Sequence, residues 1–113
     1  MKCFLKSKIH RATVTEANLN YIGSISIDSA LMQKAGIEEF EKVLVCNINN
    51  GERIETYAVK AEADSGTICL NGAAARKFLA GDLVIILAFE YSDKPVKPKI
   101  VLVNEKNAFA EFL

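Results

Sequence analysis

The stretch Lys42–Val59 has the sequence KVLVCNINNGERIETYAV, and it decides the fold class. Its two ends, up to Ile48 and from Arg53 onward, are rich in β-branched and other apolar residues. Asn50-Gly51 lies between the two ends, and Asn-Gly is among the strongest sequence signals for a tight hairpin turn. The stretch therefore predicts two antiparallel strands joined by a turn.

Further short strands are predicted on both sides of this hairpin. The segment Leu83–Phe89 (LVIILAF) is apolar at every position, which is typical of a strand with both faces covered, so we expect it deep inside the domain. The other segments show alternating or β-rich patterns, and they are Lys2–Ile9, Arg11–Thr15, Ile25–Ile27, Thr67–Leu70 and Ile100–Val103. The tail from Asn104 is apolar enough at Phe109 and Phe112 to dock on another part of the molecule.

Two short helical segments interrupt the strands. Asp28 offers an N-cap to the helix-forming run Ala30–Ala35, and Gly36 suits a left-handed helix end. Ala73–Leu79 can form one or two helical turns. Many short strands with two small helices predict a mainly β domain, either a barrel or a sandwich, that carries short helices.

Length and composition restrict the function classes. A chain of 113 residues is expected to form a single domain over residues 1–113. Its 14 basic and 14 acidic side chains cancel, so we expect no nucleic-acid partner. We also expect no membrane partner, because Leu83–Phe89 is far shorter than the ~20 apolar residues of a spanning helix. The N-terminus lacks the uninterrupted apolar segment of a secretory signal, which favours a cytoplasmic protein.

The cysteine and histidine content argues against a metal site. Cys3, Cys46 and Cys69 are far apart and odd in number, and each has apolar neighbours. This pattern favours buried free thiols in a reducing cytosol over a disulfide framework or a Cys-x-x-Cys metal site. His10 is the only histidine, which excludes a histidine-rich metal centre.

A Gly23-Ser24 pair stands inside the β-like run Asn20–Ile27, while the common enzyme motifs are absent. Spacing alone favours a bulge or tight turn here. The pair also allows an unusual reaction, in which the serine hydroxyl attacks the preceding carbonyl carbon and forms an ester. β-Elimination then breaks the chain and leaves a dehydroalanine, and loss of ammonia from this residue yields a pyruvoyl group. Glycine helps because it has no side chain to block the attack and tolerates strained backbone angles.

Four segments match the bacterial aspartate 1-decarboxylase family in order and spacing. They are Lys8–Thr15 (KIHRATVT), Tyr21-x-Gly23-Ser24, Asn50–Val59 (NGERIETYAV), and Leu70–Arg76 (LNGAAAR) followed by Ala80–Ile86 (AGDLVII). Each motif alone is weak, but the four in register are specific and outweigh the bulge interpretation of the Gly-Ser pair. The chain therefore resembles this family over nearly its whole length.

The resemblance implies a double-psi β-barrel that assembles as a homotetramer, with active sites between neighbouring subunits. It implies self-cleavage between Gly23 and Ser24, into a β chain of residues 1–23 and an α chain of residues 24–113. It further implies decarboxylation of L-aspartate to β-alanine and CO2 for pantothenate and coenzyme A biosynthesis. The cofactor would be a pyruvoyl group derived from Ser24, with no pyridoxal phosphate and no metal.

The resemblance also assigns chemical roles to individual residues. It implies that Ser24 becomes the cofactor that forms the Schiff base with the substrate, and that Tyr57 is the proton donor. Thr56 would support cleavage after Gly23 and also lie at the substrate. Without the resemblance, the favoured interpretation of Tyr57 is a strand aromatic packed on the barrel.

The resemblance also implies which residues bind the substrate. Arg53 would bind a substrate carboxylate with help from Lys8, and the remaining positions line the site: Asn71, Gly72, Ala73 and Ala74. The chemistry agrees, because the guanidinium of an arginine donates two parallel hydrogen bonds to a carboxylate. Without the family, Arg53 could equally be a solvated residue at a strand end.

Two alternatives to aspartate decarboxylation remain open at the level of sequence. One is a non-catalytic, oligomeric β-barrel that binds a partner. The other is a pyruvoyl decarboxylase for another amino acid such as glutamate, because one methylene changes pocket affinity by only ~1–3 kcal/mol. Departures from the family occur at Arg76, where some members carry histidine, and in the shorter region after Phe89.

Overall fold

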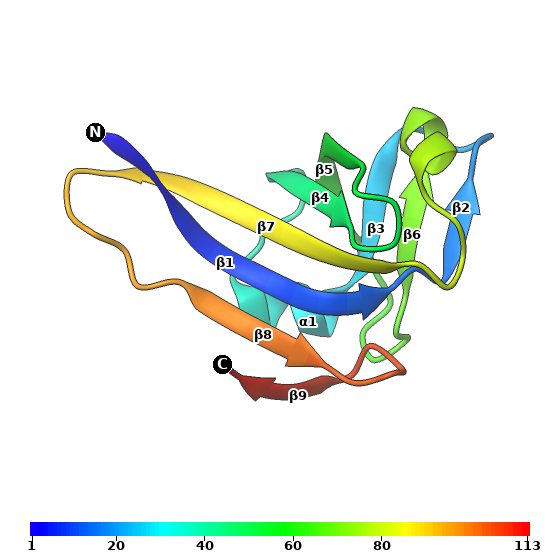
Figure 1. Cartoon of the computed structure of the whole chain (residues 1–113). Helices are drawn as coiled ribbons and strands as arrows, with labels where there is room; N and C mark the ends of the chain where they lie inside the picture. The colour runs from blue at the N-terminus through cyan, green and yellow to red at the C-terminus, as the bar shows by residue number, and fades with distance from the viewer.

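The computed structural model describes residues 1–113 and consists mainly of strands (Figure 1). The elements are β1 (Lys2–Thr13), β2 (Glu16–Asn18), β3 (Ser24–Asp28), α1 (Ser29–Ala35), β4 (Lys42–Asn47), β5 (Arg53–Ala61), β6 (Ile68–Asn71), the 3₁₀ helix η1 (Gly72–Lys77), β7 (Leu83–Ser92), β8 (Lys99–Val103) and β9 (Phe109–Phe112). The strands form a mixed sheet in the order β2-β6-β3-β5-β4-β7-β1-β8-β9. Three neighbouring pairs are parallel, β1 with β8, β2 with β6 and β3 with β5, and the arrangement is consistent with a double-psi β-barrel.

The predicted hairpin and helix ends are confirmed. β4 and β5 pair antiparallel with Lys42 opposite Tyr57, and Gly51 in their connection has a φ of 76°. Asp28 caps α1 by accepting a hydrogen bond from the backbone N–H of Ala30 at 2.8 Å. Gly36 ends the helix in the left-handed conformation with a φ of 71°, as its lack of a side chain allows.

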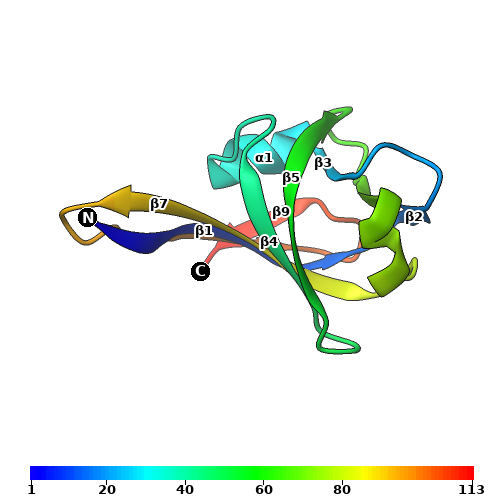
Figure 2. The same cartoon turned by 90° about the horizontal axis from the view of Figure 1, so that it is seen from above.

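β1 is one long strand, so the prediction of two separate strands within the first fifteen residues was wrong. The chain continues through Arg11, whose φ of 62° accompanies a register shift between His10 and Ala12. A bulge of this kind bends a strand without ending its pairing. β1 and β7 together form a long ribbon that extends past the other strands (Figures 1 and 2).

The core is built from one side of the central strands. Val45, Ile86, Ile9 and Val101 lie in one cross-strand row of β4, β7, β1 and β8, and all four are fully buried. The sequence predicts that both faces of Leu83–Phe89 are covered, but this single chain fully covers only one of them. Burial alternates along β7, so that only every second side chain faces the core of this chain.

The C-terminal tail packs on the sheet as the sequence predicts, whereas the burial of the cysteines differs from the prediction. The apolar tail docks as β9 on β8, where the Phe109 and Phe112 rings pack at 4.9 Å. All three cysteines are free, but only Cys69 is buried, whereas Cys46 is half-buried and Cys3 is exposed at the start of β1. No helix is long and apolar enough to cross a membrane.

Candidate active site

Ser24 is the first residue of β3 and is almost completely buried, with 2% of its surface exposed. It pairs with Asn71, the last residue of the neighbouring antiparallel strand β6. The Asn71 amide nitrogen Nδ2 donates hydrogen bonds to Ser24 Oγ and to Ser26 Oγ, each at 3.0 Å. The Ser24 hydroxyl in turn donates a longer bond, 3.4 Å, to the carbonyl oxygen of Ile22. The hydroxyl is thus held beside the Gly23–Ser24 peptide bond.

Gly72 packs directly on the backbone at Gly23. It has a φ of 66°, and a Cβ atom at this position would stand 2.7 Å from Gly23 Cα and 2.9 Å from Gly23 N. These are backbone atoms, so no side-chain movement could relieve the collision, and only glycine fits. At Gly23 itself a Cβ would meet nothing closer than 3.9 Å, so packing alone does not require that glycine. We call Gly23, Ser24, Ser26, Asn71 and Gly72 the Ser24 cluster.

Tyr57 lies on the strand next to Ser24 and on the same side of the sheet. β3 and β5 run parallel with Ile25 opposite Ala58, and both of these side chains are in the core. The preceding residues, Ser24 and Tyr57, therefore face the opposite side together. The half-buried Tyr57 ring packs against Phe40 with 6.3 Å between ring centroids.

Thr56 and η1 lie at the border of the Ser24 cluster. Thr56 stands opposite the buried Val43 on β4, so it points away from the Tyr57 side, and it makes no hydrogen bond with Gly23 or Ser24. Ala73 is exposed, whereas Ala74 is half-buried against the core. The exposed Arg76 lies in the last turn of η1, at the far end of that helix from Gly72.

Lys8, His10 and Arg53 lie on a different part of the same outward side. Arg53 and His10 share a cross-strand row that runs through Cys46 and Ile85, three strand spacings or about 14 Å along the sheet. Lys8 lies in the parallel row that runs through Leu44 and Leu87 to Glu55. We call these two rows on β5, β4, β7, β1 and β8 the open face.

The middle of the open face is apolar and only half-covered in this chain. The side chains between the charged residues are Leu44, Cys46, Ile85, Leu87, Ile100 and Leu102, and each is half-buried. Lys8 and Arg53 form no ion pair with any carboxylate, and no hydrogen bond or ion pair links them to Ser24. The sequence-predicted residues therefore fall into two groups that one chain does not bring together.

Burial and the neighbouring cations lower the pKa of His10. Its pKa falls below the ordinary value of 6.5 because burial disfavours the charged ring, and because Lys8 and Arg11 repel a further positive charge. Lys8 and Arg11 therefore make the surroundings of His10 positively charged. No group of three or more histidine, cysteine, aspartate and glutamate side chains is arranged to hold a metal ion.

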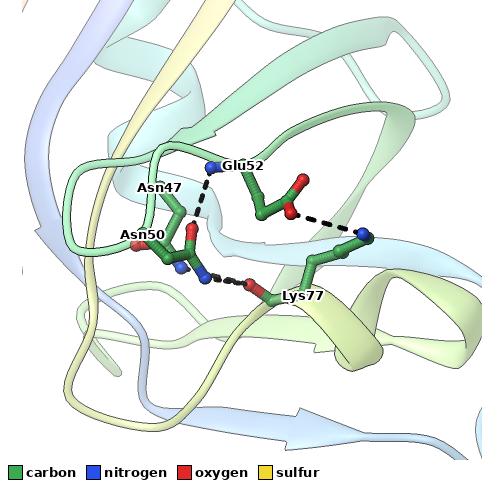
Figure 3. A network of polar contacts seen from close by, with 4 residues as sticks. All are labelled: Asn47, Asn50, Glu52 and Lys77. Atoms are coloured by element: carbon green, nitrogen blue, oxygen red, sulfur yellow. Dashed lines mark hydrogen bonds and ion pairs between the residues drawn. The ribbon is translucent and has the colours of Figure 1, made fainter.

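The turn that carries Arg53 is fixed against the end of η1 (Figure 3). Asn47 Nδ2 and Asn50 Nδ2 both donate to the carbonyl oxygen of Lys77, at 3.2 and 3.0 Å. Glu52 donates its backbone N–H to Asn50 Oδ1 at 2.8 Å, and its carboxylate pairs with Lys77 Nζ at 3.4 Å. Arg53 is the next residue, so this network limits where its side chain can reach.

Three residues of the site were missed by sequence reasoning. Ser26 and Cys69 are opposite one another on β3 and β6, on the side of Ser24 and Asn71, and Glu16 is opposite Cys69 on β2. The spacings Ser24-x-Ser26 and Cys69-x-Asn71 carry a signal, because alternate residues of a strand share a face. Which strands pair, and in which register, could not be deduced from those spacings.

The sequence of this chain is similar to that of proteins from one known family. The model of the family "Aspartate decarboxylase" matches residues 1–110. A protein named aspartate 1-decarboxylase from Caldicellulosiruptor saccharolyticus is 65% identical over 109 residues, covering 91% of this chain and 84% of the relative. Proteins of the same name from Campylobacter hominis and Clostridium acetobutylicum are 59% and 57% identical, and the matches cover 95% and 94% of this chain and 96% and 87% of theirs.

Proposed function

This chain belongs to the aspartate decarboxylase family, and we propose that it is a self-processing enzyme whose Ser24 becomes a pyruvoyl group. It decarboxylates L-aspartate to β-alanine and CO2, the reaction that supplies pantothenate and coenzyme A biosynthesis. The observation that supports the processing proposal is the buried Ser24 hydroxyl, which Asn71 holds beside the peptide bond of Gly23.

In the proposed processing, Ser24 Oγ attacks the carbonyl carbon of Gly23. The Gly23–Ser24 C–N bond breaks as the ester bond forms, and the hydroxyl proton passes to the freed amine. β-Elimination then removes the Ser24 α-proton and breaks the Cβ–O bond, which leaves Gly23 as a carboxylate and residue 24 as dehydroalanine. Water hydrolyses its imine tautomer and releases ammonia. The products are a chain of residues 1–23 and a chain of residues 24–113.

The Ser24 cluster fits a group built from residue 24. Gly72 contacts Gly23 through backbone atoms alone, and a methyl group added at Gly72 would fill the space beside the Gly23 backbone. Asn71 Nδ2 lies 3.0 Å from Ser24 Oγ, the atom that attacks Gly23 and then remains on Gly23 as a carboxylate oxygen. Asn71, Gly72, Ala73 and Ala74 are proposed to line the substrate's position.

A pyruvoyl group supplies an electron-accepting ketone, which takes up the electron pair left behind when a carboxylate departs as CO2. After CO2 has left, a side chain of this protein must donate a proton to the former α-carbon of the substrate. We assign it to the Tyr57 hydroxyl, because Tyr57 is the outward-facing neighbour of Ser24 on β5, and a neutral tyrosine can act as a general acid. We also propose that Thr56 supports cleavage, acting from the core-facing side of β5 and not from the side that Tyr57 shares with Ser24.

Carboxylate recognition is assigned to Arg53 and Lys8, and it requires a second subunit. These two cations have no acidic partner and lie on the open face, apart from the Ser24 cluster. A half-covered apolar surface of this kind is typical of a subunit interface. We therefore propose a homotetramer in which the Ser24 cluster and Tyr57 of one subunit meet the open face of its neighbour. We further propose a cytoplasmic enzyme without a nucleic-acid or membrane partner.

The deciding experiment follows the purified chain by denaturing gel and intact mass. Processing should give fragments of residues 1–23 and 24–113, and the larger fragment should begin with a pyruvoyl group. The processed protein should form β-alanine from L-aspartate faster than it consumes L-glutamate. A single intact band with no decarboxylation would contradict the proposal and favour a non-catalytic barrel. Equal turnover of glutamate would contradict only the substrate assignment.

A further inference from the structure

Cys69 and Glu16 continue the polar contacts of the Ser24 cluster beyond Asn71, and the proposed reaction uses neither of them. Cys69 Sγ lies 3.1 Å from Asn71 Oδ1 and 3.7 Å from Glu16 Oε2. Cys69 has 6% of its surface exposed and Asn71 has 2%, whereas Glu16 is exposed on β2. The thiol is thus the only side chain bonded to the carbonyl end of the Asn71 amide.

An asparagine amide has one accepting end and one donating end of nearly the same shape, so its neighbours decide which way it points. The serine hydroxyls of Ser24 and Ser26 cannot decide this alone, because a hydroxyl can both donate and accept. A protonated thiol that faces the amide does discriminate, because it offers a hydrogen to the carbonyl oxygen. With Asn71 Oδ1 facing Cys69, both N–H groups are directed at the two serines.

We propose that Cys69 is a positioning residue whose thiol hydrogen, donated to Asn71 Oδ1, fixes the amide so that its N–H groups face Ser24 and Ser26. The inference rests on the proposed function, because it takes the Ser24 hydroxyl as the group that attacks the chain. With the amide reversed, Asn71 would accept the Ser24 hydrogen, and that hydroxyl would no longer point at Ile22.

The thiol remains a donor under ordinary conditions. Burial and the neighbouring Glu16 carboxylate raise the pKa of Cys69 to about 11, so the thiolate, which could not donate, is scarce at neutral pH. Glu16 also competes for the thiol hydrogen, but its contact is longer and its carboxylate is exposed to water. Asn71 is therefore the better-placed acceptor.

The test measures the rate at which freshly purified, uncleaved chain is converted to its two fragments. Cys69→Ala removes the donor and should slow cleavage about 2- to 10-fold, the effect of losing one neutral hydrogen bond. Cys69→Ser keeps a donor and should cleave at nearly the wild-type rate. Cys3→Ala and Cys3→Ser are the controls, because Cys3 is a free strand cysteine outside the Ser24 cluster and the open face, and both should match wild type.

A double-mutant comparison separates positioning from packing. Adding Cys69→Ala to Asn71→Ala should change the cleavage rate no further, because Cys69 is proposed to act only through the Asn71 amide. If circular dichroism shows that Cys69→Ala is unfolded, Cys69→Val replaces it. Valine fills the space of the cysteine but has no donor, so cleavage should be slowed to the same extent. Equal slowing by Cys69→Ala and Cys69→Ser, or no slowing by either, overturns the inference alone. A wild-type chain that never cleaves overturns this inference together with the proposed function.

Discussion

The Ser24 cluster and the open face lie on the same side of the sheet, yet they differ in how far one chain completes them. In the Ser24 cluster, the Asn71 side chain has a partner at every polar atom, and the cluster is closed by the contact of Gly72 with Gly23. On the open face, Lys8 and Arg53 have no acidic partner, and the apolar side chains between them are half-covered.

This difference separates two chemical tasks. The proposed cleavage uses only groups that are adjacent in one molecule, so it should take place wherever a single chain has folded. The proposed recognition of a dicarboxylate needs cations at the pyruvoyl group, and we propose that the open face supplies them to another copy of the chain. Variants in the two regions should therefore fail in different ways.

The largest effect is expected from Ser24→Ala. Loss of the hydroxyl removes the attacking atom, so the chain should remain whole, and no β-alanine should form. The intact mass should equal that of the uncleaved variant, while the fold, measured by circular dichroism, is kept. Fragments ending at residue 23 in this variant would show that another group opens the peptide bond.

The second effect, in order of size, concerns Tyr57→Phe. The ring and its packing on Phe40 are retained, so the chain should fold and cleave as wild type. Turnover by the cleaved protein should fall by ~10²–10⁴-fold, the range typical of one general acid. β-Alanine formation measures the loss, with mass spectrometry confirming the pyruvoyl group. Near-normal turnover would return Tyr57 to a packing role on β5.

The sequence predicts the parts of the fold that local chemistry decides. The β4–β5 turn follows from Asn50-Gly51, and the ends of α1 follow from Asp28 and Gly36, because each depends on neighbours within a few residues. β2 and β9 were not predicted as strands, because they have three and four residues and depend on distant partners, β6 and β8.

The same distinction applies to the site. The family motifs locate Ser24, Asn71 and Tyr57, which pairing of β3 with β5 and β6 then brings together. They do not reveal Cys69, whose proposed role depends on a side-chain contact with Asn71. The apolar run of β7 indicates burial, but the sequence cannot say whether the cover comes from the same chain or from a neighbour.

The third prediction concerns Arg53→Lys, which keeps the charge but loses the two-pronged donor. Cleavage should be normal, while the KM for aspartate should rise about 10- to 100-fold, as for loss of a hydrogen bond to a charged group.

Co-expression of Arg53→Lys with Tyr57→Phe tests whether the two residues of one active site come from different subunits. Random mixing should restore about a quarter of the sites if Tyr57 and Arg53 of one site come from different copies. No recovery would place both in one chain.

The smallest effect is expected at His10, which reports on the charge of the open face. Its neighbours across the strands, Ile85 and Leu102, are apolar, and the cations beside it are Lys8 and Arg11. The pKa of His10 measured by NMR should therefore lie below 6.5, and Lys8→Met should raise it. Because the folded-state pKa is the lower one, protonation of His10 favours the unfolded state, so stability present above pH 6.5 is lost as the pH falls through the folded-state pKa.

Succinate sharpens this last prediction, because it carries two carboxylates but no amine that could react. If its carboxylate is bound by Lys8, the bound negative charge offsets the repulsion on the imidazole, and the pKa of His10 should rise. Sodium chloride at the same ionic strength controls for simple screening of Lys8 and Arg11. An equal rise with either salt would mean that the open face attracts anions without binding them. A rise with succinate alone, lost in Arg53→Lys, would join the open face to substrate recognition.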